Sequence, residues 1–158
     1  MDEADIPAGI PLPADIAERV ATTSPLGRDL GFKLVKLEKA RGVVSVEYQE
    51  KLIGNPVTRV VHGGVITALL DHASAVAVVA ALETPTSIAT LDMRIDYMRA
   101  AEPGRTIIGD AVCFKITKSV AFVRGTAYHD SIDDPIATVV CTYMLASDGG
   151  RKPGANLK

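Results

Sequence analysis

The run of residues 60–82, VVHGGVITALLDHASAVAVVAAL, is the feature that most constrains the fold, because it approaches the length of a membrane-spanning helix. It is almost entirely apolar, and its polar interruptions include His62, Asp71, His72 and Ser74. These polar residues, the many alanines and the absence of basic flanks argue against a membrane span. The run therefore predicts a helix that protein buries on nearly all sides.

Six further stretches alternate apolar and polar residues with a period of two, which is typical of half-buried strands. They are residues 30–40, 42–50, 87–98, 106–117, 120–130 and 136–147. Short turns between consecutive strands imply an antiparallel sheet, and such a sheet can curve around one long helix. The sequence thus predicts an α+β fold with about six strands wrapped round a central helix. Because six strands leave open edges, we expect pairing across a two-fold axis.

The chain of 158 residues is long enough for one domain and too short for two independent cores. We expect residues 1–25 to form a tail with a short helix at 13–23, and residues 26–147 to form the single domain. Residues 148–158 should be a mobile tail.

Charge and cysteine usage narrow the class of protein. The formal net charge of -2 provides no basic face for nucleic acid. The acidic, proline-broken N-terminus lacks the features of a signal peptide. Cys113 and Cys141 lie in strand-like stretches without metal-ligand spacing, and they are expected to be buried thiols in a reducing compartment. We therefore expect a cytoplasmic protein without a membrane or nucleic-acid partner.

Thr67, Asp71 and Ser74 are spaced i, i+4 and i+7 on the long helix, so they share one stripe. A buried carboxylate without a partner is costly or takes up a proton, so Asp71 must be paired, hydrated or functional. For an isolated acid on an apolar helix, a structural hydrogen bond is the ordinary explanation.

The sequence HGG at residues 62–64 favours a catalytic role for the acid instead. Glycines leave the first N–H groups of the helix unshielded at the positive end of its dipole, where a carbonyl oxygen is polarised as it gains negative charge. Gly63 and Asp71 are about 12 Å apart along the axis, so one carbonyl cannot touch both. The sequence predicts a site shared by the adjacent, antiparallel helices of two subunits.

The run HGGVITALLD at residues 62–71 resembles the hotdog-fold acyl-CoA thioesterases of the phenylacetyl-CoA thioesterase (PaaI-type) group. In that group HGG opens the central helix, and an Asp or Glu follows nine positions after the His. The stretch TLDMRIDYMRAAEPG (90–104) is similar to the family's next strand, and the strand pattern matches from about residue 26 to 147. The resemblance implies a hotdog fold and hydrolysis of an acyl-CoA by a homodimer, or by a dimer of dimers, without a cofactor.

The resemblance also implies roles for single residues. The Gly63 N–H would bind the thioester carbonyl, and Asp71 would attack that carbon or deprotonate a water. Thr90 matches a family Ser or Thr that positions the water or the acid, although strand alternation puts it on the polar face. Asn55 corresponds to the family's Asn before HGG, but it precedes His62 by seven positions where the family often has six.

The other candidates concern binding. His62 either hydrogen-bonds the loop or the carbonyl environment, or acts in catalysis, and the first role is favoured. Gly64 and Thr67 are candidate substrate-binding residues, and Arg99 and Lys118 are candidate cations for the CoA phosphates. A metal site is not expected, because His62, Asp71 and His72 do not converge on one helix. We expect His72 to be packed or paired at an interface, and the candidates for an acyl slot are Phe32, Val65, Leu69 and Tyr97.

Two other functions remain open. A non-catalytic acyl-CoA-binding hotdog protein would keep the pocket and release no thiol. A hotdog hydratase or dehydratase requires an Asp and a His acting on a hydroxyacyl chain, and the DxNxxH arrangement of such enzymes is absent from the sequence.

Overall fold

A computed structural model describes residues 24–146 of the chain. The predicted helix at 13–23 and most of the two predicted tails lie outside these residues. The elements are α2 (Pro25–Leu30), β1 (Phe32–Glu38), β2 (Arg41–Val46), the 3-10 helix η2 (Glu50–Leu52), α3 (Gly63–Ala81), β3 (Ile88–Tyr97), β4 (Ile107–Ile116), β5 (Val120–Tyr128) and β6 (Pro135–Leu145). All six predicted strands and the long helix are therefore confirmed.

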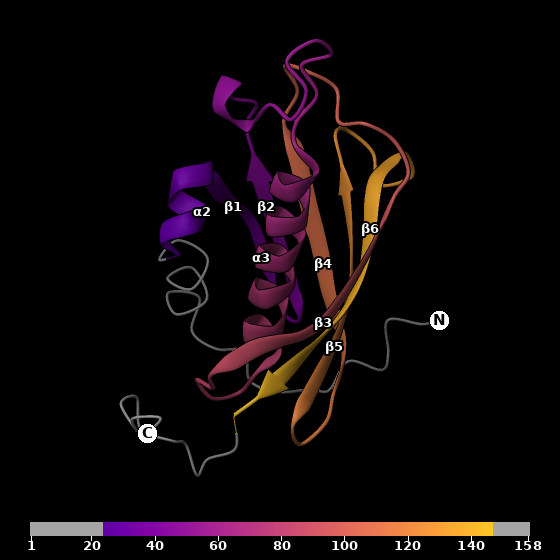
Figure 1. Cartoon of the computed structure of the whole chain (residues 1–158). Coiled ribbons are helices and arrows are strands. Elements are labelled where there is room, and N and C mark those ends of the chain that lie inside the picture. Colours follow the sequence, from indigo (N-terminus) through magenta and orange to yellow (C-terminus); the bar gives the residue numbers. More distant parts are fainter. Residues whose placement is uncertain (1–23, 147–158) are drawn as a thin grey trace, which may run out of the picture.

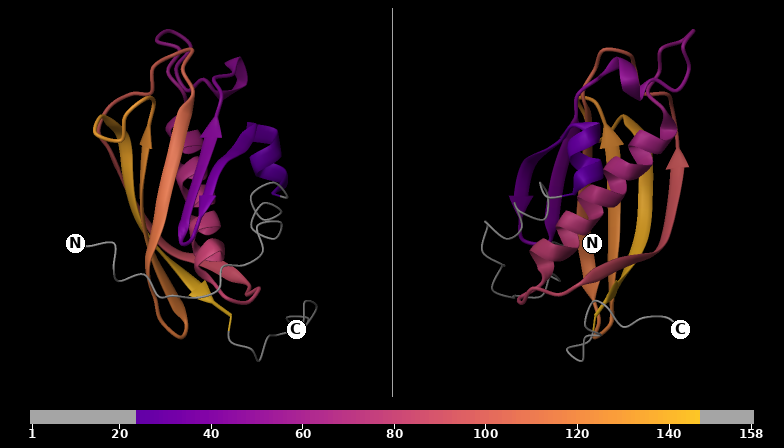
Figure 2. Two further views of the ribbon diagram at one scale, coloured as in Figure 1. Left: turned by 180° about the vertical axis from the view of Figure 1, so that it is seen from behind. Right: turned by 60° about the vertical axis from the view of Figure 1, so that its left-hand side comes forward.

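The six strands form one antiparallel sheet in the order β1-β2-β4-β5-β6-β3. Figures 1 and 2 show the sheet curving around α3, which lies along its inner face. The first strand after the helix, β3, crosses to the far edge, where it pairs with β6. The predicted α+β architecture is confirmed, and within residues 24–146 the edge strands of the sheet are β1 and β3.

The helix α2 was not predicted, although the sequence contains its signals. The Ser24 side chain accepts a hydrogen bond from the Gly27 N–H at 3.2 Å, and Pro25 occupies the first turn. Gly31 ends the helix with a left-handed φ of 80°. Residues 30 and 31, predicted to begin a strand, belong instead to this helix and its cap.

The core lies between α3 and the sheet. Along α3 the residues Val65, Ile66, Leu69, Leu70, Ala73, Ser74, Val76, Ala77, Val78, Val79 and Ala80 are buried. Within the described residues α3 is the one helix long and apolar enough to cross a membrane by length and composition, and most of it is buried inside the protein. It is thus the central helix of the domain, as predicted.

Two glycines allow the helix to lie close to the sheet. A Cβ on Gly42 of β2 would lie 2.7 Å from Val76 Cγ1 and 2.9 Å from the Ala73 carbonyl oxygen. A Cβ on Gly109 of β4 would lie 3.0 Å from Leu69 Cγ. Close packing at these points fixes the height of α3 above the sheet, and with it the position of Asp71.

Candidate active site

The Asp71 side chain is partly buried on α3 and points toward the edge of the sheet formed by β3 and β6. Its Oδ1 accepts hydrogen bonds from Thr90 Oγ1 and from the Tyr143 hydroxyl, both at 2.9 Å. Thr67 also contacts β3, while Ser74 is fully buried and its Oγ has no hydrogen-bond partner within residues 24–146. The predicted polar stripe of α3 therefore contains one acid that is paired by hydroxyl groups rather than by a cation.

The structure corrects the predicted face of Thr90. Strand alternation placed it opposite Met93, Ile95 and Tyr97, but a bulge lies between Thr90 and Asp92. The extra residue, Leu91, shifts the alternation, so Thr90 reaches Asp71 while Met93 and Ile95 pack on the same core. The contact between Thr90 and the acid, implied by the resemblance, therefore exists.

Tyr143 is a candidate site residue that the sequence analysis missed. It lies on β6, directly opposite Thr90 in the sheet register, and it is 2% exposed. Its hydroxyl is 2.9 Å from both the carbonyl oxygen and Oδ1 of Asp71. Burial, and next the charge of Asp71, raises the pKa of Tyr143, so the hydroxyl remains a proton donor.

The start of α3 presents the second part of the site. His62 is the N-cap residue, and its Nδ1 accepts a hydrogen bond from the Gly64 N–H at 2.9 Å. The Val65 N–H donates a hydrogen bond to the His62 carbonyl oxygen. The Gly63 N–H, in contrast, has no acceptor in the described part of the chain. Of the two histidine roles considered, the structure shows the structural hydrogen bond, and it leaves Gly63 as the open donor of the HGG sequence.

Tyr97 ties this end of the helix to the edge strand. Its hydroxyl donates to the Gly63 carbonyl oxygen at 2.8 Å and lies 2.7 Å from Thr67 Oγ1. Thr67 Oγ1 is also 3.2 Å from the same carbonyl oxygen. The hydroxyl of Thr67, a predicted substrate-binding residue, is therefore hydrogen-bonded within its own chain. These bonds lie where Tyr97 of β3 holds the first residue of α3, Gly63.

The open N–H and the acid do not meet within one chain. Gly63 and Asp71 belong to one continuous helix, so two turns, or about 12 Å, separate them. Each is tied to a different point of the same edge strand, Gly63 to Tyr97 and Asp71 to Thr90. This geometry makes β3 the element that connects the two halves of the site.

Asn55 lies in the exposed loop between η2 and α3. Its Oδ1 accepts hydrogen bonds from the N–H groups of Val57 at 2.9 Å and Thr58 at 3.2 Å, so it shapes a turn. The stem of the loop is closed by the bonds from the Gly54 N–H to Val60 and from the His62 N–H to Leu52. Within its own chain the Asn55 side-chain oxygen is hydrogen-bonded to backbone N–H groups of the loop. The catalytic role of Asn55 stays a prediction.

The two predicted phosphate-binding cations lie in different connections, one after β3 and the other between β4 and β5. Figure 1 shows these two connections at opposite ends of the sheet. Arg99 follows β3 and makes a bidentate pair with Asp134, with N···O distances of 3.1 and 2.9 Å. A phosphate at Arg99 would have to compete with that carboxylate. Lys118 is exposed in the turn between β4 and β5, and no ion pair involves it within residues 24–146.

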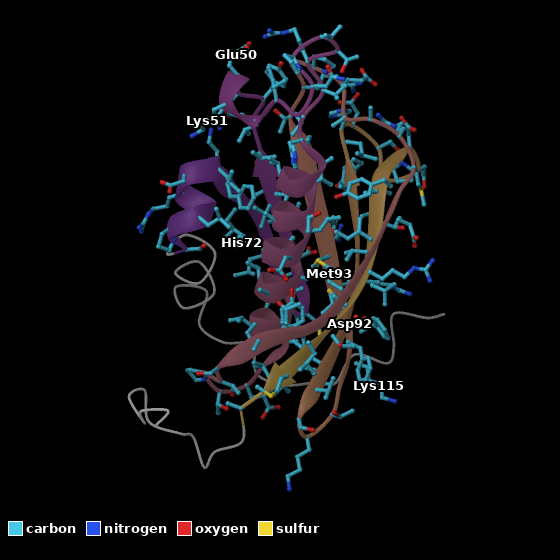
Figure 3. The ribbon with its side chains drawn as sticks, viewed as in Figure 1. Glu50, Lys51, His72, Asp92, Met93 and Lys115 are labelled. Carbon is cyan, nitrogen blue, oxygen red and sulfur yellow. The ribbon has the colours of Figure 1, made fainter. Side chains whose placement is uncertain are left out.

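His72 and Leu69 pack against other elements of the fold. The His72 ring packs against Phe32 with centroids 5.5 Å apart, on the side of α3 that faces α2 (Figure 3). Leu69 is fully buried under Gly109 and is a core residue rather than part of an open slot. Among the described residues no group of three or more His, Cys, Asp or Glu is placed to hold a metal ion.

Comparisons with known proteins agree with this fold. Residues 59–136, which include the start of α3, Asp71 and Thr90, match the thioesterase superfamily. The chain is 27% identical over 143 residues to a medium/long-chain acyl-CoA thioesterase, YigI, of Salmonella typhimurium, covering 82% of this chain and 91% of the relative. It therefore belongs to the thioesterase superfamily, and the predicted family is confirmed.

Solved structures show the same fold. A crystal structure of a protein from Pseudomonas aeruginosa matches with a TM-score of 0.75 and 37% identity, covering 82% of this chain and 96% of the other. A mutant of the phenylacetic acid degradation protein PaaI from Thermus thermophilus matches with a TM-score of 0.67 and 25% identity, covering 77% and 98%. The hotdog fold predicted from the sequence is thus confirmed.

Proposed function

We propose that this chain is an acyl-CoA thioesterase whose active site combines Asp71 of one copy with the Gly63 N–H of another. The observation that carries the proposal is the anchored carboxylate of Asp71, which two hydroxyl groups hold at one oxygen on the edge side of α3. The membership of the thioesterase superfamily supports hydrolysis as the reaction class.

The chemistry follows from the two groups. The Gly63 N–H donates to the thioester carbonyl oxygen and stabilises the negative charge that it gains in the transition state. Asp71 either removes a proton from a water that attacks the carbonyl carbon or attacks that carbon itself, forming an anhydride that water then cleaves. In both routes the C–S bond breaks, and the products are a carboxylic acid and free CoA.

The edge strand supports the shared site. On β3 Thr90 lies beside Asp71 and Tyr97 lies beside Gly63, near opposite ends of the strand. Antiparallel pairing of two β3 edges across a two-fold axis would bring the Thr90 end of one copy next to the Tyr97 end of the other. The Asp71 carboxylate of one copy would then approach the Gly63 N–H of its partner, and each dimer would hold two sites.

The acyl group and the CoA contacts belong to the same proposal. The relative named as a medium/long-chain acyl-CoA thioesterase favours medium and long acyl chains as first substrates. The similarity to PaaI, a phenylacetic acid degradation protein, adds phenylacetyl-CoA to the panel. Lys118 is the better candidate of the two cations for a CoA phosphate, because Asp134 already neutralises Arg99. A dimer of dimers, a cytoplasmic location and a reaction without metal or cofactor stay predictions.

The test is a thiol-release assay over a panel of acyl-CoAs, with Asp71→Asn as the variant. Both cysteines of the chain are buried, and burial raises the pKa of Cys141 and raises that of Cys113 to about 11, so the protein's own thiols should contribute little signal. We expect Asp71→Asn to lose about three orders of magnitude in kcat with the fold intact. Saturable CoA binding without thiol release, or near-normal turnover by the variant, would contradict the proposal.

A further inference from the structure

We propose that Tyr143 is a positioning residue for this reaction: together with Thr90 it holds Asp71 Oδ1, and so makes Oδ2 the oxygen that reacts. The inference rests on the proposed function. Tyr143 lies on β6, whereas Asp71 lies on α3.

The two oxygens of Asp71 have different surroundings. Oδ1 accepts hydrogen bonds from Thr90 Oγ1 and from the Tyr143 hydroxyl, each at 2.9 Å. Within residues 24–146 no group donates to Oδ2, and the one buried side-chain nitrogen or oxygen without a partner is Ser74 Oγ. Oδ2 is therefore both unpaired and reached by solvent, as an oxygen that deprotonates water or attacks a carbonyl carbon must be.

The sheet, rather than the helix, fixes the anchor. Thr90 on β3 and Tyr143 on β6 are direct partners in the register of the two strands. Their hydroxyl groups therefore reach α3 from one rigid unit, and the bulge at Leu91 lets Thr90 take part. Two donors from adjacent strands restrict rotation of the carboxylate about its Cβ–Cγ bond, so Oδ2 keeps one direction.

Tyr143 is suited to donate throughout the working pH range. It is fully surrounded by protein, and burial together with the charge of Asp71 raises the pKa of its hydroxyl. The same hydroxyl also lies 2.9 Å from the Asp71 carbonyl oxygen, which ties the side chain to the backbone of α3 at that residue. A phenylalanine would fill the space and remove only the donor.

The experiment compares Tyr143→Phe with the native chain in kcat, KM and melting temperature. We expect kcat to fall about tenfold to a hundredfold, with KM changed by less than about twofold. A merely structural tyrosine would lower the melting temperature and leave kcat, measured well below that temperature, at the native value.

Thr90→Val tests the second donor, and Tyr128→Phe is the matched control. Tyr128 lies on β5, where Asp110 and Arg41 are the charged groups that act on it, away from Asp71. We expect Thr90→Val to lower kcat with little change in KM, as Tyr143→Phe does, and Tyr128→Phe to leave kcat unchanged.

The outcomes separate this inference from the proposed function. If the native chain released no thiol from any acyl-CoA, the proposed function would fail. If the native chain were active and Asp71→Asn inactive, but Tyr143→Phe kept the native kcat, only the role of Tyr143 would be wrong.

Thr90→Val also covers the case in which Tyr143→Phe does not fold. Thr90 is exposed, and the substitution removes the other donor to Asp71 Oδ1. A native kcat in Thr90→Val would overturn the inference.

Discussion

At the residue scale, Gly63 allows the proposed oxyanion donor to be removed without removing the helix. It is the first residue of α3, a position that tolerates proline because its N–H has no partner within the helix. His62 before it has the extended conformation, with φ -62° and ψ 132°, that suits a residue preceding proline. A Cβ on Gly63 would lie 3.4 Å from the Tyr97 hydroxyl, which is ordinary contact.

We therefore expect Gly63→Pro to fold and to lose about a hundredfold to a thousandfold in kcat, because it lacks the N–H that would stabilise the oxyanion. Gly63→Ala adds a side chain at the same place but keeps the N–H, and it should stay within about tenfold of the native kcat. Thiol release measures both, and circular dichroism checks the helix. Equal activities for the two variants would count against Gly63 as the donor.

The site residues that could be predicted from the sequence are those whose chemistry contrasts with their surroundings. Asp71 is a carboxylate on an apolar helix, and the pair of glycines precedes it. Tyr143 has no such contrast, because it stands in the apolar run of β6. The alternation along β6 indicates that Tyr143 points inward together with Cys141 and Leu145. A buried tyrosine hydroxyl requires a hydrogen-bond partner, and this requirement could have indicated Tyr143 as a site residue.

At the element scale, the bulge in β3 limited the prediction. The alternation of residues 87–98 predicts a regular strand, and an extra residue at Leu91 leaves no mark in that pattern. The bulge interrupts the regular pairing of β3 with β6 and leaves Leu91 exposed. It also turns the Thr90 side chain toward α3, where it reaches Asp71. The type of element could be predicted from local sequence, whereas the facing of Thr90 depends on contacts with β6 and α3.

The contact between β2 and α3 yields a prediction at the same scale. In Gly42→Ala the new methyl group would meet Val76 Cγ1 at 2.7 Å and the Ala73 carbonyl oxygen at 2.9 Å, so the helix must move. We expect a loss of about 1–3 kcal/mol in the free energy of unfolding, together with a lower kcat, because Ala73 is two residues from Asp71.

Gly109→Ala is the comparison for this change. Its methyl group would meet the Leu69 side chain at 3.0 Å, and a side chain yields more easily than the helix backbone. Urea unfolding should therefore show a smaller loss for Gly109→Ala than for Gly42→Ala. A Gly42→Ala protein with native stability and turnover would mean that the height of α3 does not control the site.

At the scale of the whole molecule, the order of elements along the chain was sufficient to predict the class of fold. Two strands, one long apolar helix and four strands indicate a sheet wrapped round that helix. The order of strands in the sheet did not follow from this pattern. The transfer of β3 to the far edge beside β6 depends on pairings between distant segments, which local patterns do not encode.

The position of β3 at an edge of the sheet allows two copies to pair along this strand. If two copies pair along β3, each site takes its acid from one copy and its N–H donor from the other. Homodimers of Asp71→Asn and of Gly63→Pro would both be inactive. A mixed dimer would have one site with both defects and one site with none, because the native Asp71 of the Gly63→Pro copy would face the native Gly63 of the Asp71→Asn copy.

Purified mixed dimers, obtained by co-expression with two different affinity tags, should therefore recover about half of the native kcat per dimer. An equal mixture that exchanges subunits at random should reach about a quarter, since half of its dimers are mixed. The measurement is thiol release from the acyl-CoA that the native chain cleaves fastest. If each site used Asp71 and Gly63 of the same copy, every site in the mixed dimer would carry one defect, and its activity would be no higher than the average of the two inactive parents.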